Sequence, residues 1–190
     1  MRLFIAVELN EEVRNVLVSI CKQLRPRVSD VRWTSPEQLH LTIKFLGEVE
    51  ESRISELTNA IDSAAQNARP FDFRLDGAGC FPSHGPARIV WAGLHEATGR
   101  LFKLVSEVEA AMEAPGFPRE SREFSPHVTI GRVKEDRSAG RIRSMVESQA
   151  VPPASQSVNR LTLMSSKLSP NGSIYSTIHQ SPLAHKRGAE

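Results

Sequence analysis

The stretch HLTIKFLG at residues 40–47 contains a His-x-Thr element, which returns in HVTIGRV at residues 127–133. Each copy follows a proline-containing turn and lies in a run of residues typical of a β-strand. Random placement of the six histidines and seven threonines in the chain would give about 0.2 such pairs. Two copies with matching apolar neighbours therefore indicate a quasi-duplicated structure.

Strand alternation assigns the residues of each copy to two faces. Residues i and i+2 lie on the same face, about 6.6 Å apart along the chain. The apolar residues between and after the polar ones would pack in the core, and the histidine and threonine would project from the opposite face. The four projecting residues are His40, Thr42, His127 and Thr129.

Two-fold symmetry between the copies would bring two imidazoles and two hydroxyls into one cleft. These groups suit a phosphate diester, because hydroxyls donate to the non-bridging oxygens and the imidazoles divide the acid and base work. A single His-x-Thr would more often hold a structural histidine, but the pair favours a site. No metal or other cofactor is expected, since neither copy has a nearby Asp, Glu or Cys ligand.

The surrounding residues predict an α+β fold with a mostly antiparallel sheet. Strands are expected at 2–9, 31–34, 39–46, 71–75, 88–94, 127–133, 157–168 and 173–179, and helices at 11–24, 50–67, 97–114 and 139–148. The glycine-rich segment 77–86 is expected to be a loop, and Ser169-Pro170-Asn171-Gly172 a hairpin turn. Frequent hairpins favour this class over a doubly wound parallel sheet. With no linker, residues 1–190 are expected to form one compact domain of two pseudo-symmetric lobes, with helices outside, a central cleft and a flexible tail at 184–190.

Composition indicates an ordinary globular protein. The chain has 190 residues, a net charge of +2 and 39% hydrophobic residues, and its mildly basic character is compatible with an anionic substrate. The opening MRLFIAVELN does not resemble a signal peptide, and no apolar run could span a bilayer. We therefore expect a cytoplasmic protein without membrane contact, with Cys21 and Cys80 as reduced thiols, and a monomer.

At its two motifs the sequence resembles the two-histidine (2H) phosphoesterases, and most closely the RNA 2′,3′-cyclic phosphodiesterases, formerly described as 2′-5′ RNA ligases. The similar stretches are MRLFIAVELNEEV (1–13), HLTIKFLGEV (40–49), CFPSHGPARIVWAGL (80–94), SPHVTIGRVK (125–134) and LTLMSSKLSPNGSIYSTI (161–178). The resemblance implies a bilobal α+β body with an antiparallel sheet in each lobe. It also implies metal-independent hydrolysis of a cyclic phosphate at an RNA end, or of a nucleoside 2′,3′-cyclic phosphate, to a 2′-phosphate.

The resemblance also implies roles for individual residues. His127 matches the general base that takes a proton from the attacking water, and His40 matches the general acid that protonates the departing 3′ oxygen. Thr42 and Thr129 match the phosphate-binding hydroxyls. Phe45 and Arg132 match the residues that hold the terminal base of the RNA between them.

Strand alternation conflicts with part of this assignment. It places Phe45 and Arg132 on the core side, so we expect the second strand to end or bulge before its arginine, whereas Phe45 could belong to the core. Lys44 shares the face of His40 and would either raise the positive potential of the cleft or be solvated at the strand end. His84 and Arg88 lie beside the proline-glycine loop and have no assigned role.

Two other functions remain open. The first is RNA ligation, the reverse reaction, which would require the protein to hold two RNA ends, and no second basic lobe is visible for that. The second is binding of phosphorylated RNA ends without turnover, which would not require two titratable imidazoles.

Overall fold

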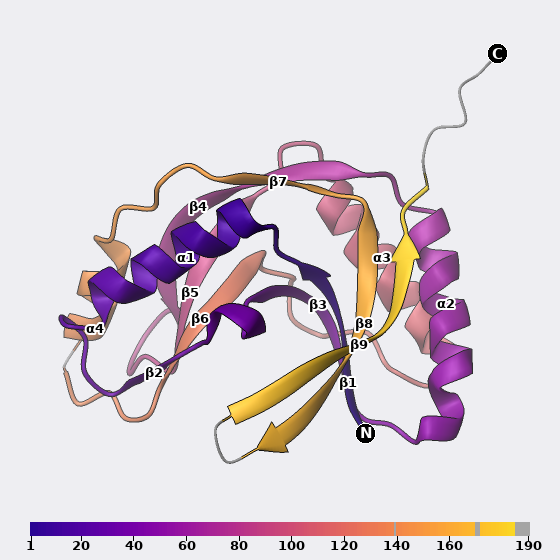
Figure 1. Cartoon of the computed structure of the whole chain (residues 1–190), viewed down its shortest axis with the longest axis horizontal. Helices are drawn as coiled ribbons and strands as arrows, with labels where there is room; N and C mark the ends of the chain where they lie inside the picture. Colours follow the sequence, from indigo (N-terminus) through magenta and orange to yellow (C-terminus); the bar gives the residue numbers. More distant parts are fainter. Residues whose placement is uncertain (139, 170–171, 185–190) are drawn as a thin grey trace.

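The predicted α+β class is confirmed by a computed structural model, which describes residues 1–138, 140–169 and 172–184 (Figure 1). Its strands form one curled antiparallel sheet in the order β7-β4-β5-β6-β3-β1-β8-β9, with β2 paired to β6. The strands are β1 (Arg2–Glu8), β2 (Val31–Trp33), β3 (His40–Glu48), β4 (Phe71–Phe81), β5 (Ile89–His95), β6 (His127–Val133), β7 (Ser155–Val158), β8 (Arg160–Ser169) and β9 (Gly172–Pro182). The helices are α1 (Glu11–Leu24), η1 (Pro36–Gln38), η2 (Glu51–Arg53), α2 (Ile54–Gln66), α3 (Arg100–Glu113) and α4 (Arg141–Glu147).

The two lobes are the two halves of this sheet. Within the described residues, β3 and β6 share one register pair, Leu41 opposite Val128, which we call the central pair. Helices α1 and α4 lie beside the half that contains β4 to β7, and α2 and α3 lie beside the half that contains β1, β8 and β9 (Figure 1). Strand β1 and helix α1 follow one another in the sequence but belong to different halves of the sheet. The chain therefore passes from one lobe to the other directly after its first strand.

Helix α1 follows the sequence prediction closely. The side chain of Asn10 caps it by accepting a hydrogen bond from the N–H of Val13 at 2.8 Å. Its buried residues share the stripe spacing of an amphipathic helix; they are Val13, Leu17, Ile20, Cys21 and Leu24. Cys21 and Cys80 are both buried free thiols, and burial raises the pKa of each to about 11.

A β-bulge in the middle of each motif strand reverses its alternation. In β3, Thr42 is opposite Ala6 but Lys44 is opposite Ile5, so β3 contains one extra residue. The side chain of Phe45 is therefore 57% exposed, and the alternative that placed it in the core is wrong. In β6 the same irregularity falls between Thr129 and Gly131, which confirms the bulge that was expected before the arginine.

The bulge also buries Lys44, so both expectations for this residue are wrong. Lys44 is 3% exposed, and its Nζ donates to Glu109 Oε2 at 2.6 Å and to the carbonyl of Pro118 at 2.9 Å. The Glu109 carboxylate also accepts a hydrogen bond from the N–H of Glu120 at 3.2 Å. This buried pair joins β3 to α3 and to the segment that follows α3.

Two other expectations differ from the structure. Strand β4 continues into the segment predicted as a loop and ends at Phe81, and residues 82–88 connect it to β5. Gly79 lets the Trp91 ring lie directly on the β4 backbone, since a Cβ there would be 2.4 Å from that ring. The single strand expected at 157–168 is divided at Asn159 into β7 and β8. Residues 170–171 of the predicted turn and 185–190 of the predicted tail lie outside the described residues.

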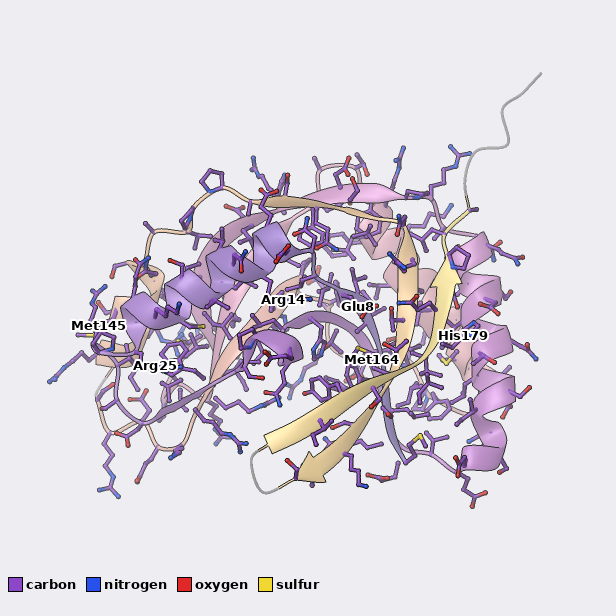
Figure 2. The ribbon with its side chains drawn as sticks, viewed as in Figure 1. Glu8, Arg14, Arg25, Met145, Met164 and His179 are labelled. Atoms are coloured by element: carbon purple, nitrogen blue, oxygen red, sulfur yellow. The ribbon has the colours of Figure 1, made fainter. Side chains whose placement is uncertain are left out.

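The β8–β9 hairpin is attached to the body near its base. His179, labelled in Figure 2, donates from Nε2 to Asp62 of α2 at 2.8 Å, and Ser181 donates to the same carboxylate oxygen at 2.5 Å. Toward its tip, Gln38 of η1 donates to the carbonyl of Ser173. No helix in the described ranges is long and apolar enough to cross a membrane.

Removal of the buried carboxylate should destabilise the fold strongly. Glu109→Ala leaves the Lys44 ammonium buried without a counter-charge, and we expect a loss of about 3–5 kcal/mol in the free energy of unfolding, measured with urea. The double variant Lys44→Met/Glu109→Leu removes both charges and should recover most of that loss.

The control is Arg137→Ala, which breaks an exposed ion pair with Glu135 whose side chains are 83% and 61% exposed. It should cost at most about 1 kcal/mol. An equally small effect of Glu109→Ala would contradict the structural role of the buried pair.

Candidate active site

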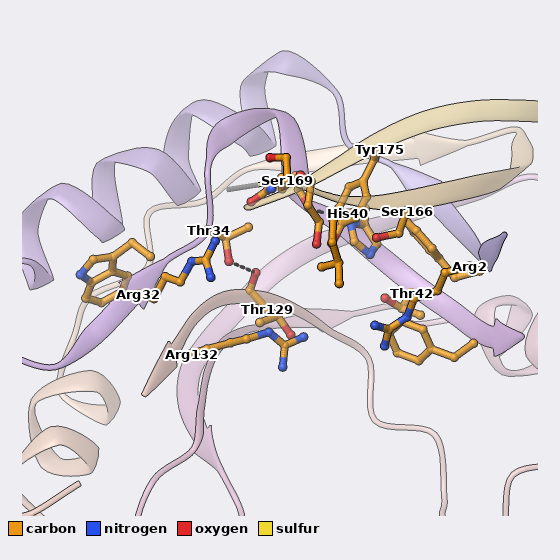
Figure 3. A pocket seen from close by; sticks show the side chains of 16 residues that line it. Arg2, Arg32, Thr34, His40, Thr42, Thr129, Arg132, Ser166, Ser169 and Tyr175 are labelled. Atoms are coloured by element: carbon orange, nitrogen blue, oxygen red, sulfur yellow. Dashed lines mark hydrogen bonds between the residues drawn. The ribbon is translucent and has the colours of Figure 1, made fainter. Parts of the chain in front are cut away.

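A cavity of about 380 Å³ opens on the concave side of the sheet, between the motif strands and the β8–β9 hairpin (Figure 3). His40, Thr42 and Thr129 line it, together with Phe45 and Arg132. Five of the six site residues predicted from the sequence therefore line one cavity. The bulges explain why Phe45 and Arg132 are included, because strict alternation would have turned both toward the core.

The sixth residue, His127, is not among those that line the cavity, but the register of the sheet places it next to them. In an antiparallel pair of strands, the residues that flank the central pair face one another. Extended by one residue on each side, this register sets His40 opposite Thr129 and Thr42 opposite His127. Residues directly opposite in this way have Cβ atoms about 5 Å apart, so the four motif residues form one cluster across β3 and β6.

The two histidines have the same backbone hydrogen bond. Nδ1 of His40 lies 2.7 Å from the carbonyl oxygen of Gln38, and Nδ1 of His127 lies 2.7 Å from that of Ser125. A carbonyl oxygen only accepts, so Nδ1 must carry the hydrogen in both rings. Nε2 of each neutral imidazole is then left with a lone pair that can accept a proton.

Burial favours the neutral form of both rings. It lowers the pKa of His40 below its ordinary value, the charge of Arg132 lowers it further, and the hydrogen bond to Gln38 opposes the shift. Burial also lowers the pKa of His127, against the opposing hydrogen bond to Ser125. At neutral pH, both imidazoles of the free protein are therefore predominantly uncharged.

Aromatic rings cover both histidines. The His40 ring lies 4.8 Å from Phe4 at an interplanar angle of 34° and 5.3 Å from Tyr175 at 83°. The His127 ring meets Phe81 edge to face at 5.0 Å and 85°. Because Tyr175 belongs to β9, the hairpin covers His40 from one side. These contacts desolvate the rings and restrict their rotation.

Positive charge is concentrated in the cavity. Three arginines line it, Arg2, Arg32 and Arg132, and no Asp or Glu is among the described residues that do so. The chain as a whole has a net charge of only +2, so the acidic residues lie elsewhere. A concave site with cationic walls attracts anions, and this arrangement suits a phosphate ligand.

Arg2 and Arg32 were not predicted from the sequence. The available signal was the alternation of β1, where Leu3, Ile5 and Val7 are buried and Arg2 lies on the other face. By contrast, His84 and Arg88 do not line this cavity. His84 lines a separate surface hollow, formed between the loop after β4 and the start of α4.

The cluster is poorly suited to a metal ion. Within the described part of the chain, no group of three or more His, Cys, Asp or Glu side chains could hold one. Two imidazoles opposite two hydroxyls supply proton donors and acceptors rather than a ligand set of the usual kind. The arrangement can transfer protons at two points and donate hydrogen bonds to an anion between them.

Comparison with known proteins agrees with this geometry. The model of the family "LigT like Phosphoesterase" matches residues 7–91 and 93–175. An RNA 2′,3′-cyclic phosphodiesterase of Thermotoga maritima is 37% identical over 180 residues, which cover 95% of this chain and 94% of the relative. The crystal structure of a Thermus thermophilus protein superimposes with a TM-score of 0.80 at 31% identity and covers 98% of this chain and 100% of that one. The chain belongs to the LigT-like phosphoesterase family.

Proposed function

We propose that the protein is an RNA 2′,3′-cyclic phosphodiesterase that converts a terminal 2′,3′-cyclic phosphate to a 2′-phosphate. The observation that carries this proposal is the matched pair of histidines, each held through Nδ1 and opposite a threonine, beside a cationic cavity. The name of the Thermotoga maritima relative supports the same activity.

The reaction divides the proton transfers between the two Nε2 atoms. Neutral His127 takes a proton from a water molecule as the water oxygen forms its bond to phosphorus. Protonated His40 donates its Nε2 proton to the 3′ oxygen as the bond between phosphorus and that oxygen breaks, so the phosphate remains on the 2′ oxygen. The resemblance to the 2H family assigns this direction, and the depressed pKa of His40 makes its protonated form a stronger acid.

The threonines hold the phosphate during this transfer. Charge grows on the two non-bridging oxygens in the transition state, and the hydroxyls of Thr42 and Thr129 donate to them. Phe45 and Arg132 bind the terminal base between an aromatic ring and a guanidinium plane, both of which stack well on bases. The exposed Phe45 ring and the exposed Arg132 in the cavity wall support this role.

The proposal also covers cofactors, the oligomeric state and the location of the enzyme. Two imidazoles are sufficient for the chemistry, so the enzyme acts without a metal or other cofactor and retains activity in EDTA. It acts as one domain, as a monomer, on RNA ends in the cytoplasm. Sedimentation with and without substrate tests the oligomeric state.

Loss of either histidine should abolish most of the activity. His40→Ala and His127→Ala each remove general acid or base catalysis, and we expect turnover of nucleoside 2′,3′-cyclic phosphates to fall about 10²-fold or more. The double variant should lose less than the product of the two, because both groups act on one transition state. The assay is product formation in EDTA, with the 2′ and 3′ phosphate isomers separated by chromatography.

The matched control is His84→Ala, which removes an exposed histidine outside the cavity and should leave turnover within about twofold of the unmodified enzyme. Near-normal turnover of a folded His127→Ala variant would disprove the assigned roles, and a 3′-phosphate product would disprove the direction of the reaction.

The pH dependence follows from the two depressed pKa values. Activity requires one imidazole neutral and the other protonated, so kcat/KM should fall both below the pKa of the base and above that of the acid. Because burial lowers both, the optimum for the free enzyme should lie below about 6.5, the ordinary histidine value. Bound phosphate is an anion that favours the imidazolium, so the kcat profile should move to higher pH. A kcat/KM that rises steadily into the alkaline range would contradict this account.

The threonines should affect turnover more than affinity. Thr42→Val and Thr129→Val keep the β-branched shape and delete the hydroxyl donor, so the strands should still form. A donor that acts on charge developing in the transition state should lower kcat by about 10-fold or more when it is lost, with a smaller change in the affinity for a nucleoside 2′-phosphate. Thr177→Val, an exposed position on β9, is the control. Unchanged kcat in both motif variants would mean that the hydroxyls do not face the phosphate.

A further inference from the structure

A second set of polar side chains lines the same cavity. Arg2 of β1 is directly opposite Ser166 of β8, and Ser166 is directly opposite Tyr175 of β9. Opposite residues in antiparallel strands share a face, and adjacent strands are about 4.8 Å apart. All three residues line the cavity, so a guanidinium and two hydroxyl-bearing side chains form a row across three strands. We call these residues the Arg2 row.

Arg2 and Ser166 are displaced from the threonine and histidine cluster, whereas the ring of Tyr175 lies 5.3 Å from that of His40. Thr42 is opposite Ala6, which is four residues along β1 from Arg2, or about 13 Å between the Cα positions. Figure 3 shows Arg2, Ser166 and Tyr175 on the side of the cavity where Thr42 lies, whereas Arg32 lies on the opposite side. The row can therefore bind a group that is part of the same ligand as the phosphate at Thr42 but is distinct from it.

The guanidinium of Arg2 is suited to bind an anionic group such as a phosphate. A guanidinium offers five N–H donors in a fixed fork that matches two phosphate oxygens. In the part of the chain that the structure describes, Arg2 has no hydrogen-bond or ion-pair partner through its side chain. Glu48, opposite Arg2 on β3, lies 3.3 Å from the amino terminus instead. The fork is thus available to a ligand.

We propose that the Arg2 row binds the phosphodiester on the 5′ side of the terminal nucleotide, so that the enzyme prefers RNA chains to mononucleotides. The inference rests on the proposed function, in which the cyclic phosphate itself is bound by Thr42 and Thr129. The next anionic group of an RNA substrate is the adjacent phosphodiester, and a mononucleotide lacks it. Bidentate contact with Arg2, helped by the Ser166 hydroxyl, then contributes to binding only when a second nucleotide is present.

The test compares two substrates that differ by one nucleotide. We measure kcat/KM for adenosine 2′,3′-cyclic phosphate and for the dinucleotide ApA with the same cyclic end. Arg2→Gln should lower the ratio of dinucleotide to mononucleotide kcat/KM by about 10-fold, the loss expected for a hydrogen bond to a charged group. Arg2→Lys keeps the charge but not the fork and should restore part of the ratio. Ser166→Ala should lower the ratio by a smaller factor.

Salt dependence gives a second readout. Loss of one phosphate contact on a single strand should reduce the slope of log kcat/KM against log salt by about 0.7 for the dinucleotide. The matched control is Arg74→Gln, which removes an exposed strand arginine of β4 that does not line the cavity. It should change neither the ratio nor the slope.

Equilibrium binding separates this proposal from the proposed function. Calorimetry with the two products, adenosine 2′-phosphate and ApA 2′-phosphate, needs no turnover, and Arg2→Gln should reduce the preference for the dinucleotide by about 10-fold. Absence of hydrolysis by the unmodified protein, with that binding preference intact, would overturn the proposed function alone. Normal hydrolysis with the same ratio in Arg2→Gln and the unmodified enzyme would overturn the Arg2 row.

Discussion

The geometry of the site depends on the contact between β3 and β6 at the central pair, Leu41 and Val128. This register pair is where the two halves of the sheet meet, and both of its side chains are fully buried. A slip of one residue in either strand would turn its histidine and threonine to the core and its apolar residues to the cavity. The burial of these apolar neighbours therefore holds the polar residues in place, and the fold and the site are specified by the same few positions.

Much of this arrangement could be predicted because both strands have simple alternation up to Thr42 and Thr129. The motif spacing and the helix expected at 11–24 are local features, and each agrees with the structure. Beyond the threonines the prediction depended on bulges. Only the charge of Arg132 indicated one from sequence, because an arginine is rarely buried alone.

The position of Lys44 could not have been predicted from its own strand. Its burial depends on Glu109 and Pro118, which are 65 and 74 residues further along the chain. The equivalent position in the second motif is Gly131, where a Cβ would lie 2.7 Å from the Val31 side chain. The two strands therefore contain the same bulge with different residues, and the His-x-Thr repeat alone does not reveal this difference. Arg2 was missed for a similar reason, since its ligand-facing role depends on pairing with β8 and β9.

The central claim is that His40 and His127 work together on one phosphate through Nε2, and histidine-ring ¹⁵N NMR tests it most directly. In the free protein, both rings should show the Nδ1–H tautomer that the carbonyls of Gln38 and Ser125 require. Titration with a nucleoside 2′-phosphate should shift the Nε2 resonances of both rings at the same ligand concentration and leave those of His84 and His95 unchanged. The opposite tautomer in either ring, or a shift of only one of the two, would contradict the account.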